Sequence, residues 1–167
     1  MKGLPIKGRR RQMNRNSVQI LTTILLLSVP WAFADTYVRQ PAIDAVHYDI
    51  SIEVTDKSDT VVGRTGIRIL IRAESVSDMW LDFEGMSVDR LLVGHATRPF
   101  TCHDGRLKFE FDRTYLRNEI VQIEVRYHGK PQEGLLFGKN RYGQRVVFAD
   151  NWPARAHLWF PSIDHPS

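Results

Sequence analysis

The chain has 167 residues, of which 43% are hydrophobic and 25% are charged, with 11 Gly and 8 Pro. This composition is that of an ordinary globular domain, and it excludes collagen-like, low-complexity and intrinsically disordered classes. The formal net charge of +4 and the pI of about 9.4 would indicate a nucleic-acid partner only if the basic residues lay within the folded part of the chain.

The first 34 residues have the organisation of a secretory signal peptide. Six cations precede an apolar run from Val18 to Ala34; they are Lys2, Lys7, Arg9, Arg10, Arg11 and Arg15. The run ends in Ala32-Phe33-Ala34, the small-x-small pattern that a signal peptidase cleaves. An uncleaved anchor is the weaker interpretation, because the run contains Pro30 and is shorter than the roughly 20 residues that span a bilayer. We predict a signal-peptide helix over residues 1–34, with Met13 as an alternative start.

Cleavage after Ala34 reverses the sign of the charge. Removing the six cations leaves 17 of the 23 Lys and Arg residues against 19 Asp and Glu, a net charge of −2 for residues 35–167. The basic pI therefore belongs to the targeting segment, and no nucleic-acid partner is expected. We predict an exported protein, periplasmic or secreted, that meets a membrane only during export. Its single cysteine, Cys102, leaves no internal disulfide and no cysteine-based zinc cluster.

Residues 35–167 are predicted to form one β domain, because apolar and polar residues alternate with period two in short runs. In chain order, the apolar faces are Tyr48, Ile50, Ile52 and Val54; Ile67, Ile69 and Ile71; Met79, Leu81 and Phe83; Leu107, Phe109 and Phe111; and Val121, Ile123, Val125 and Tyr127. Shorter strands are expected at residues 88–93, 135–137 and 145–148. The fold class is all-β, an antiparallel β-sandwich or open barrel of about seven or eight strands.

The predicted connections are hairpin turns. Turn residues occupy positions 56–59, 94–99 and 102–105, and a further turn at 140–143 joins the last two short strands. The third of these contains Asp104-Gly105, a strong signal for a tight hairpin.

The histidines do not form a recognisable catalytic or metal site. None of His47, His95, His103, His128, His157 and His165 belongs to a His-Glu-x-x-His helix. The sequence also lacks a Gly-x-Ser-x-Gly nucleophile elbow and a Walker phosphate loop. No catalytic residue, metal ligand or cofactor is therefore predicted in this chain.

The C-terminal segment, residues 148–166, is rich in Trp, Phe and Pro and has neither helical nor strand periodicity. Two interpretations are open. The segment is either a structural plug over one end of the sandwich, with Trp159 and Phe160 buried, or a rigid loop that presents Asp150, Asn151 and Arg155 to a ligand or partner domain.

Three stretches resemble the amino-terminal domain of the M1 family of zinc aminopeptidases, the gluzincin group. His47-Tyr48-Asp49-Ile50-Ser51-Ile52-Glu53-Val54 is similar to the opening strand of the family. Gly134-Leu135 with Tyr142-Gly143 is similar to its Gly-Leu-Tyr hairpin, and residues 156–166 resemble its Ala-Arg-x-x-Phe-Pro-x-x-Asp-x-Pro segment. The run from Phe148 to Trp159 is similar to a bacterial, exported branch of the family.

The resemblance implies an amino-terminal β-sandwich that forms one edge of the substrate cleft of an enzyme that removes amino-terminal residues from peptides. Zinc and its ligands would belong to the full-length enzyme, since no zinc-binding motif is present here. The family residues that hold the α-amine of the substrate align with Asp150 and Trp152, so Asp150, with Asn151 second, is the expected substrate-binding residue. Arg155 and Asp164 are expected to stabilise the loop and the junction with the next domain.

The resemblance also implies that the β-sandwich of residues 35–167 is incomplete at its C-terminus and that a catalytic domain is its missing partner. The chain alone is then expected to be inactive as a peptidase. The alternative is a stand-alone secreted β-sandwich binding module, in which the aromatic loop 148–160, with Phe148, Trp152 and Trp159, forms a platform for a sugar or peptide.

Overall fold

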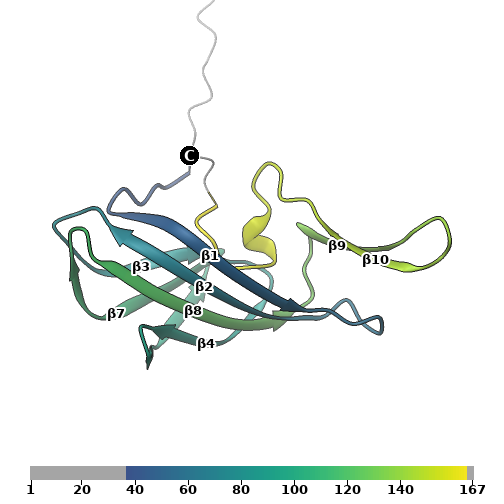
Figure 1. The fold of residues 1–167 in the computed structure, drawn as a ribbon, viewed down its shortest axis with the longest axis horizontal. Helices are drawn as coiled ribbons and strands as arrows, with labels where there is room; N and C mark the ends of the chain where they lie inside the picture. Colours follow the sequence, from purple (N-terminus) through teal and green to yellow (C-terminus); the bar gives the residue numbers. More distant parts are fainter. Residues whose placement is uncertain (1–36, 165–167) are drawn as a thin grey trace, which may run out of the picture. The chain divides into compact units, whose positions relative to one another are not determined.

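The computed structural model describes residues 37–164, and the predicted signal-peptide segment, residues 1–34, lies outside the described residues. The described chain is all-β, as predicted, with ten strands and one 3₁₀ turn (Figure 1). These are β1 (Ile43–Glu53), β2 (Val61–Ile71), β3 (Ser75–Asp82), β4 (Ser87–Val93), β5 (Ala96–Thr97), β6 (Phe100–His103), β7 (Arg106–Leu116), β8 (Ile120–Gly129), β9 (Leu135–Lys139), β10 (Arg145–Ala149) and η1 (Ala156–Leu158). Eight strands overlap the predicted runs, whereas the pattern misses the short β5 and β6.

The strands form two antiparallel sheets and a separate hairpin. The larger sheet has the order β1-β2-β8-β4-β5, and the smaller has the order β3-β7-β6. Ile67 of β2 lies opposite Tyr48 of β1 and Ile123 of β8. In the turn between β6 and β7, Asp104 and Gly105 have φ values of 50° and 69°, the left-handed geometry that the Asp-Gly signal predicts. This arrangement is the predicted antiparallel β-sandwich.

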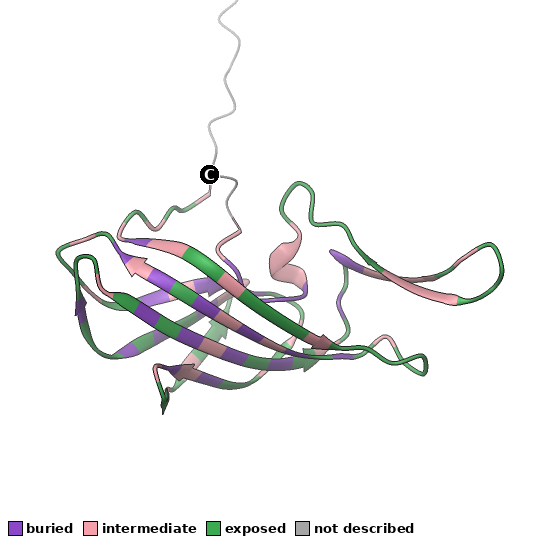
Figure 2. Cartoon of the chain, viewed as in Figure 1, coloured by how far each residue is buried: buried purple, intermediate pink, exposed green. Residues whose placement is uncertain are grey.

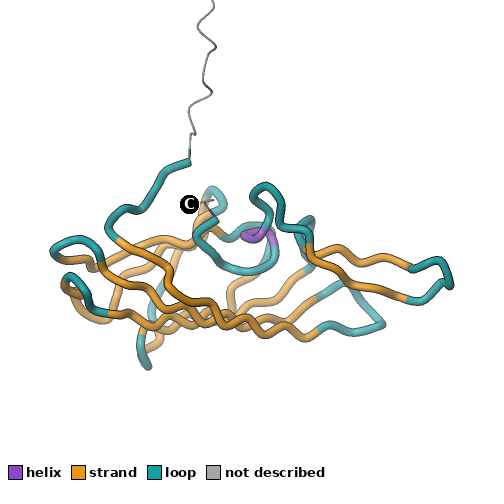
Figure 3. The backbone as a smooth tube through the Cα atoms, turned by 45° about the horizontal axis from the view of Figure 1, so that its top comes forward, coloured by secondary structure: helices purple, strands orange, loops and turns teal. Residues whose placement is uncertain are grey.

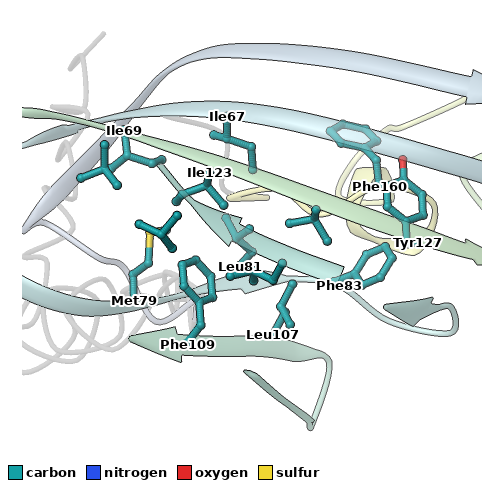
Figure 4. Packing of buried hydrophobic residues seen from close by; sticks show 14 of the residues in the cluster. Ile67, Ile69, Met79, Leu81, Phe83, Leu107, Phe109, Ile123, Tyr127 and Phe160 are labelled. Atoms are coloured by element: carbon teal, nitrogen blue, oxygen red, sulfur yellow. The ribbon is translucent and has the colours of Figure 1, made fainter. Parts of the chain in front are cut away.

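The core lies between the two sheets and consists of the alternate residues that the sequence pattern selects. Figure 2 shows the resulting stripes of buried and exposed residues along β2 and β8. In Figure 4, Ile67 and Ile69 of the larger sheet pack in one cluster with Met79, Leu81 and Phe109 of the smaller sheet. Ile69 and Leu81 are fully buried, and each such side chain contributes about 1.5–3 kcal/mol through burial.

One apolar face is less buried than the alternation predicts. Ile50 and Val54 remain 38% and 42% exposed, whereas Tyr48 and Ile52 are partly buried against the core. The reason is position, since β1 is the edge strand of the five-stranded sheet. Period-two alternation identifies the apolar face of a strand, but its burial depends on what covers that face.

Residues 135–164 leave the sandwich and return to it. β9 and β10 pair only with each other within the described residues, and the hairpin projects from the two sheets in Figure 1. The chain then passes through a loop and the helical turn η1, drawn in purple in Figure 3, back to the smaller sheet. There Ser162 and Asp82 of β3 exchange two backbone hydrogen bonds of 2.8 and 3.0 Å.

The outer edge of β3 is also occupied by a side chain. Gln40 donates from Nε2 to the carbonyl oxygen of Trp80 at 2.9 Å, and its Oε1 accepts the backbone N–H of Trp80 at 3.3 Å. Further along the same strand, the pairing with β7 shifts register between Val76 and Asp78. The edge of β3 is therefore occupied at Asp82 and at Trp80, and its ladder is irregular between Val76 and Asp78.

Candidate functional site

The loop that joins β10 to η1, residues 150–155, is held against the start of β9. The backbone N–H of Asp150 donates to the carbonyl oxygen of Gly134 at 2.8 Å. Gly134 has a φ of 76°, and a Cβ atom at this position would lie 2.3 Å from the carbonyl oxygen of Arg155. Glycine is therefore required by both the left-handed backbone and the close approach of the loop. This contact fixes the 150–155 loop relative to the hairpin.

Asp150 lies at the surface of the loop, with its carboxylate held at two points. Oδ1 accepts the backbone N–H of Trp152 at 3.3 Å, and Oδ2 lies 3.3 Å from Nη1 of Arg155. Arg155 also pairs through Nε with Glu133 at 3.1 Å. The Asp150 side chain is still 49% exposed. A carboxylate that is oriented but open to solvent can accept charge-assisted hydrogen bonds from a cationic ligand group.

Asn151 lies beside Asp150, but its amide oxygen is used within the fold. Oδ1 accepts the indole N–H of Trp159 at 2.8 Å. Trp159 is only 8% exposed and packs edge-to-face on Phe160, with 4.6 Å between ring centroids. The Nδ2 amino group is thus the part of the Asn151 side chain that is left for a ligand.

The aromatic residues of the segment fall into a buried and an exposed set. Trp159 and Phe160 are buried, as one of the two interpretations predicts, whereas Phe148 and Trp152 are 54% and 79% exposed. The burial of Trp159 corrects the alternative prediction, because this ring is not available to a platform that binds a sugar or peptide. The segment therefore has the buried rings of the first interpretation, and Asp150 and Asn151 of the loop are exposed at the surface.

A second group of polar side chains anchors the end of the segment. Asp164 Oδ2 lies 2.6 Å from Nδ1 of His157, and the Asp164 backbone N–H donates to Oδ2 of Asp82 at 3.0 Å. The hydroxyl of Tyr37 donates to the same Asp82 oxygen. Burial, and then the hydrogen bond to Asp82, raise the pKa of Tyr37 above its ordinary value. These contacts and the ion pairs of Arg155 fit the loop-stabilising role expected of Arg155 and Asp164.

Metal-ligating residues do not gather in the described part of the chain. No three His, Cys, Asp or Glu side chains of residues 37–164 lie where they could hold a metal ion. Cys102 is an exposed free thiol. Among these same residues, the structure has no helix with the length and apolar character of a membrane span.

The fold is that of the amino-terminal domain of M1 zinc metallopeptidases. No family model and no curated protein matches the chain in sequence. Among solved structures, an M1 zinc metallopeptidase from Deinococcus radiodurans is 19% identical with a TM-score of 0.66, over 77% of this chain and 30% of that chain. A mutant M1 enzyme from the same organism, bound to a Tyr-Ser-Ala substrate, is 19% identical with a TM-score of 0.64, over 77% and 31% of the two chains.

Another solved structure, from yeast, has a similar fold. Yeast LTA4 hydrolase is 16% identical with a TM-score of 0.66, over 75% of this chain and 21% of that chain. The chain thus spans less than a third of the length of each of these three proteins. The comparisons confirm the M1 amino-terminal-domain-like fold that the sequence resemblance predicts.

Sequence reasoning found Asp150 and Asn151 in the loop but missed the two residues that position it, Gly134 and Glu133. The sequence places Gly134 in the hairpin motif, but its contact with Arg155 depends on how the hairpin folds back. A glycine directly before a strand was the available signal. Glu133 had no signal, because its partner lies more than twenty residues further along the chain.

Proposed function

We propose that this chain is the non-catalytic amino-terminal domain of an exported M1-type zinc aminopeptidase, an enzyme that removes amino-terminal residues from peptides. In this proposal the 150–155 loop forms one edge of the substrate cleft. The zinc ion and the groups that activate water belong to a catalytic domain, which is the partner of this chain. The observation that carries the proposal is the likeness of the whole β-sandwich to M1 metallopeptidases of known structure.

Asp150 is the proposed ligand of the free α-amine of the peptide. An unblocked amino terminus is an ammonium group, which a carboxylate binds through charge-assisted hydrogen bonds. Trp152 and Arg155 orient the Asp150 carboxylate without covering it. Because Arg155 is also paired with Glu133, it keeps a counter-charge when Asp150 turns toward a ligand ammonium. Asn151 offers its Nδ2 amino group beside this point.

The exposed rings of Phe148 and Trp152 are the proposed contact with the catalytic domain. Both rings are large, apolar and exposed, and exposed apolar surface is typical of a surface that another protein covers. Their exposure is also the observation that favours the second candidate, a stand-alone binding module that takes a sugar or peptide on these two rings. The two candidates differ in whether a catalytic domain is required.

The first experiment is to sequence the DNA downstream of this coding region and to translate all frames. The M1 proposal expects a continuous or adjoining frame that carries His-Glu-x-x-His followed by a further Glu. A locus without such a frame contradicts the proposal and favours the binding module.

The second experiment measures selectivity for free amino termini in the protein that contains this chain together with the catalytic domain. In the variant Asp150→Asn, Trp152 keeps an acceptor for its N–H, but the negative charge is lost. We expect kcat/KM for an unblocked aminoacyl substrate to fall about tenfold or more, in line with the roughly 1.5–3 kcal/mol of a charge-assisted hydrogen bond.

The matched control is Asp56→Asn in the turn between β1 and β2, which also removes one negative charge and should leave kcat/KM unchanged. Equal activity of the Asp150→Asn variant and the native enzyme would remove Asp150 from the substrate cleft.

A further inference from the structure

Strand β2 contains two glycines, and internal packing explains only one of them. A Cβ atom at Gly63 would lie 2.2 Å from the ring of Tyr127, so no larger residue fits there. A Cβ atom at Gly66 would make ordinary contacts, with its nearest neighbours, atoms of Asp49 and Arg64, at 3.7 and 3.8 Å. Glycine at position 66 is therefore not required by the atoms around it.

A glycine inside a strand costs stability and commonly marks a bulge or a place where a ligand approaches the backbone. Gly66 is not at a bulge, because it pairs in continuous register with Asp49 of β1 and Glu124 of β8. The close approach of a ligand accounts for a glycine at this position.

Gly66 lines a hollow on the outer face of the five-stranded sheet, which we call the Gly66 hollow. Its volume is about 340 Å³. Two kinds of polar group line it. The carboxylates are Asp49 and Glu124, and the hydrogen-bond donors are Arg64, Arg68, Gln122, His47 and His95.

Both carboxylates are already neutralised by arginines. Arg64 lies 3.2 Å from Asp49 and 3.5 Å from Glu124, and Arg126 pairs with Glu124 at 2.8 Å. The other donors have no partner within residues 37–164. No hydrogen bond or ion pair is made there by the side chains of Arg68, Gln122, His47 and His95. His47 and Gln122 lie directly opposite Arg68 on the neighbouring strands. The groups of the hollow that lack a partner are therefore hydrogen-bond donors, and they surround the guanidinium of Arg68.

The wider face adds positive charge. Arg64, Arg126 and Arg90 lie opposite one another on β2, β8 and β4, and the hydrogen bonds of Arg90 go to the neutral hydroxyl of Thr97. Since Arg64 and Arg126 are offset by Asp49 and Glu124, Arg68 and Arg90 are the arginines of this face that have no carboxylate partner among residues 37–164, and their charge attracts anions to it.

We propose that the Gly66 hollow binds the oxyanion group, a carboxylate or a phosphate, of a small ligand. The guanidinium fork of Arg68 matches either group in a bidentate geometry. His47 and Gln122 on its two sides donate to the remaining oxygen atoms, and the absence of a side chain at Gly66 lets the ligand reach the backbone. This site lies on the outer sheet face and is independent of the proposed function of the 150–155 loop.

The test is an amide NMR titration of the purified chain with sodium phosphate and, separately, with sodium acetate, at fixed pH and at an ionic strength held constant with NaCl. We expect saturable shifts at Gly66 and its neighbours with at least one probe. Saturation at lower phosphate than acetate concentration identifies a phosphate ligand, and the reverse order identifies a carboxylate. No saturable shift with either probe overturns the proposal.

Two variants make the test specific. Arg68→Gln removes the guanidinium, and Gly66→Val fills the hollow while retaining strand preference; each is expected to weaken binding at least tenfold. Lys108→Gln, on the outer face of the smaller sheet, removes the same charge and should leave binding unchanged. If Gly66→Val binds as tightly as the native chain, or if Lys108→Gln weakens binding as much as Arg68→Gln does, the shifts reflect general salt effects and the proposal fails.

Discussion

The carbonyl oxygen of Arg155 lies only 2.3 Å from the place that a Cβ atom would occupy at Gly134. Residue 134 precedes the β9–β10 hairpin and residue 155 follows it, so this contact closes the base of the hairpin. A backbone oxygen cannot turn aside as a flexible side chain can. The position of the whole 150–155 loop therefore depends on the absence of a side chain at one residue.

We expect Gly134→Ala to destabilise the chain by more than about 2 kcal/mol, since alanine meets both the left-handed backbone and the Arg155 carbonyl. Urea unfolding followed by circular dichroism measures the change. Gly138→Ala is the control, because no atom lies within 4 Å of a Cβ at that position in β9. Its stability should match the native chain or exceed it by about 0.5–1 kcal/mol. Similar losses in both variants would contradict the role of Gly134.

The hydrogen bond from Trp159 to Asn151 gives a second prediction. Asn151→Leu leaves a buried indole N–H without its acceptor, which costs about 1–3 kcal/mol of unfolding free energy. Asn151→Asp keeps an acceptor at the same place and should be nearly as stable as the native chain. Thermal unfolding with tryptophan fluorescence as the probe distinguishes the two. A stable Asn151→Leu variant would mean that Trp159 is held by packing alone.

Glu119 gives a prediction on pH. Its carboxylate accepts two hydrogen bonds from Arg113, at 2.8 and 3.0 Å, and one from the backbone N–H of Leu116. These bonds, with Arg113 the largest cause, lower the pKa of Glu119 from 4.5 to about 2. The stabilisation is present above the unfolded value of 4.5 and is lost as the pH falls toward 2.

An NMR titration of the side-chain carboxyl carbon should therefore place the midpoint for Glu119 near 2. In Arg113→Gln the midpoint should move back toward 4.5, while the Leu116 bond retains part of the shift. In Glu119→Gln, stability should fall less steeply over the same pH range. An unshifted midpoint in the native chain would show that the ion pair is not formed in solution.

The purified chain should neither hydrolyse aminoacyl p-nitroanilides nor bind one equivalent of zinc. The reason is that the zinc-binding motif of M1 enzymes is not in this sequence. Metal analysis after dialysis and a bestatin-sensitive hydrolysis assay measure the two properties. Robust bestatin-sensitive activity in a preparation without another polypeptide would overturn the proposal that the catalytic groups belong to a separate domain.

Much of the fold was predictable because burial on one face of a strand leaves a period-two pattern. Met79 and Leu81, or Ile67 and Ile69, carry that pattern and lie in the core. β5 and β6 were missed because two and four residues are too short for the period to appear. Ile50 was expected to be buried but is exposed, since alternation carries no information about the edge of a sheet.

Of the candidate site, only residues that are neighbours in the sequence could be predicted. Asp150 and Asn151 are adjacent, and both stood out within an unusual loop. Their hydrogen-bond partners are Gly134, which precedes them in the chain, and Trp159, which follows them, and only the folded chain brings these partners to the loop. The Gly66 hollow was not predicted, because a glycine on the outer face reads as one more non-apolar position in an alternating strand, and the residues that line the hollow come from several strands.

The side-chain amide of Gln40 on the edge of β3 has a consequence for solubility. An edge strand with free N–H and C=O groups is a template on which strands of other molecules add, and this is a common start of aggregation. Gln40 occupies both groups of Trp80, Ser162 occupies those of Asp82, and the irregularity between Val76 and Asp78 breaks the ladder beyond them. An incoming strand would have to displace a glutamine amide before it gained its first hydrogen bonds, so this edge is protected against self-association.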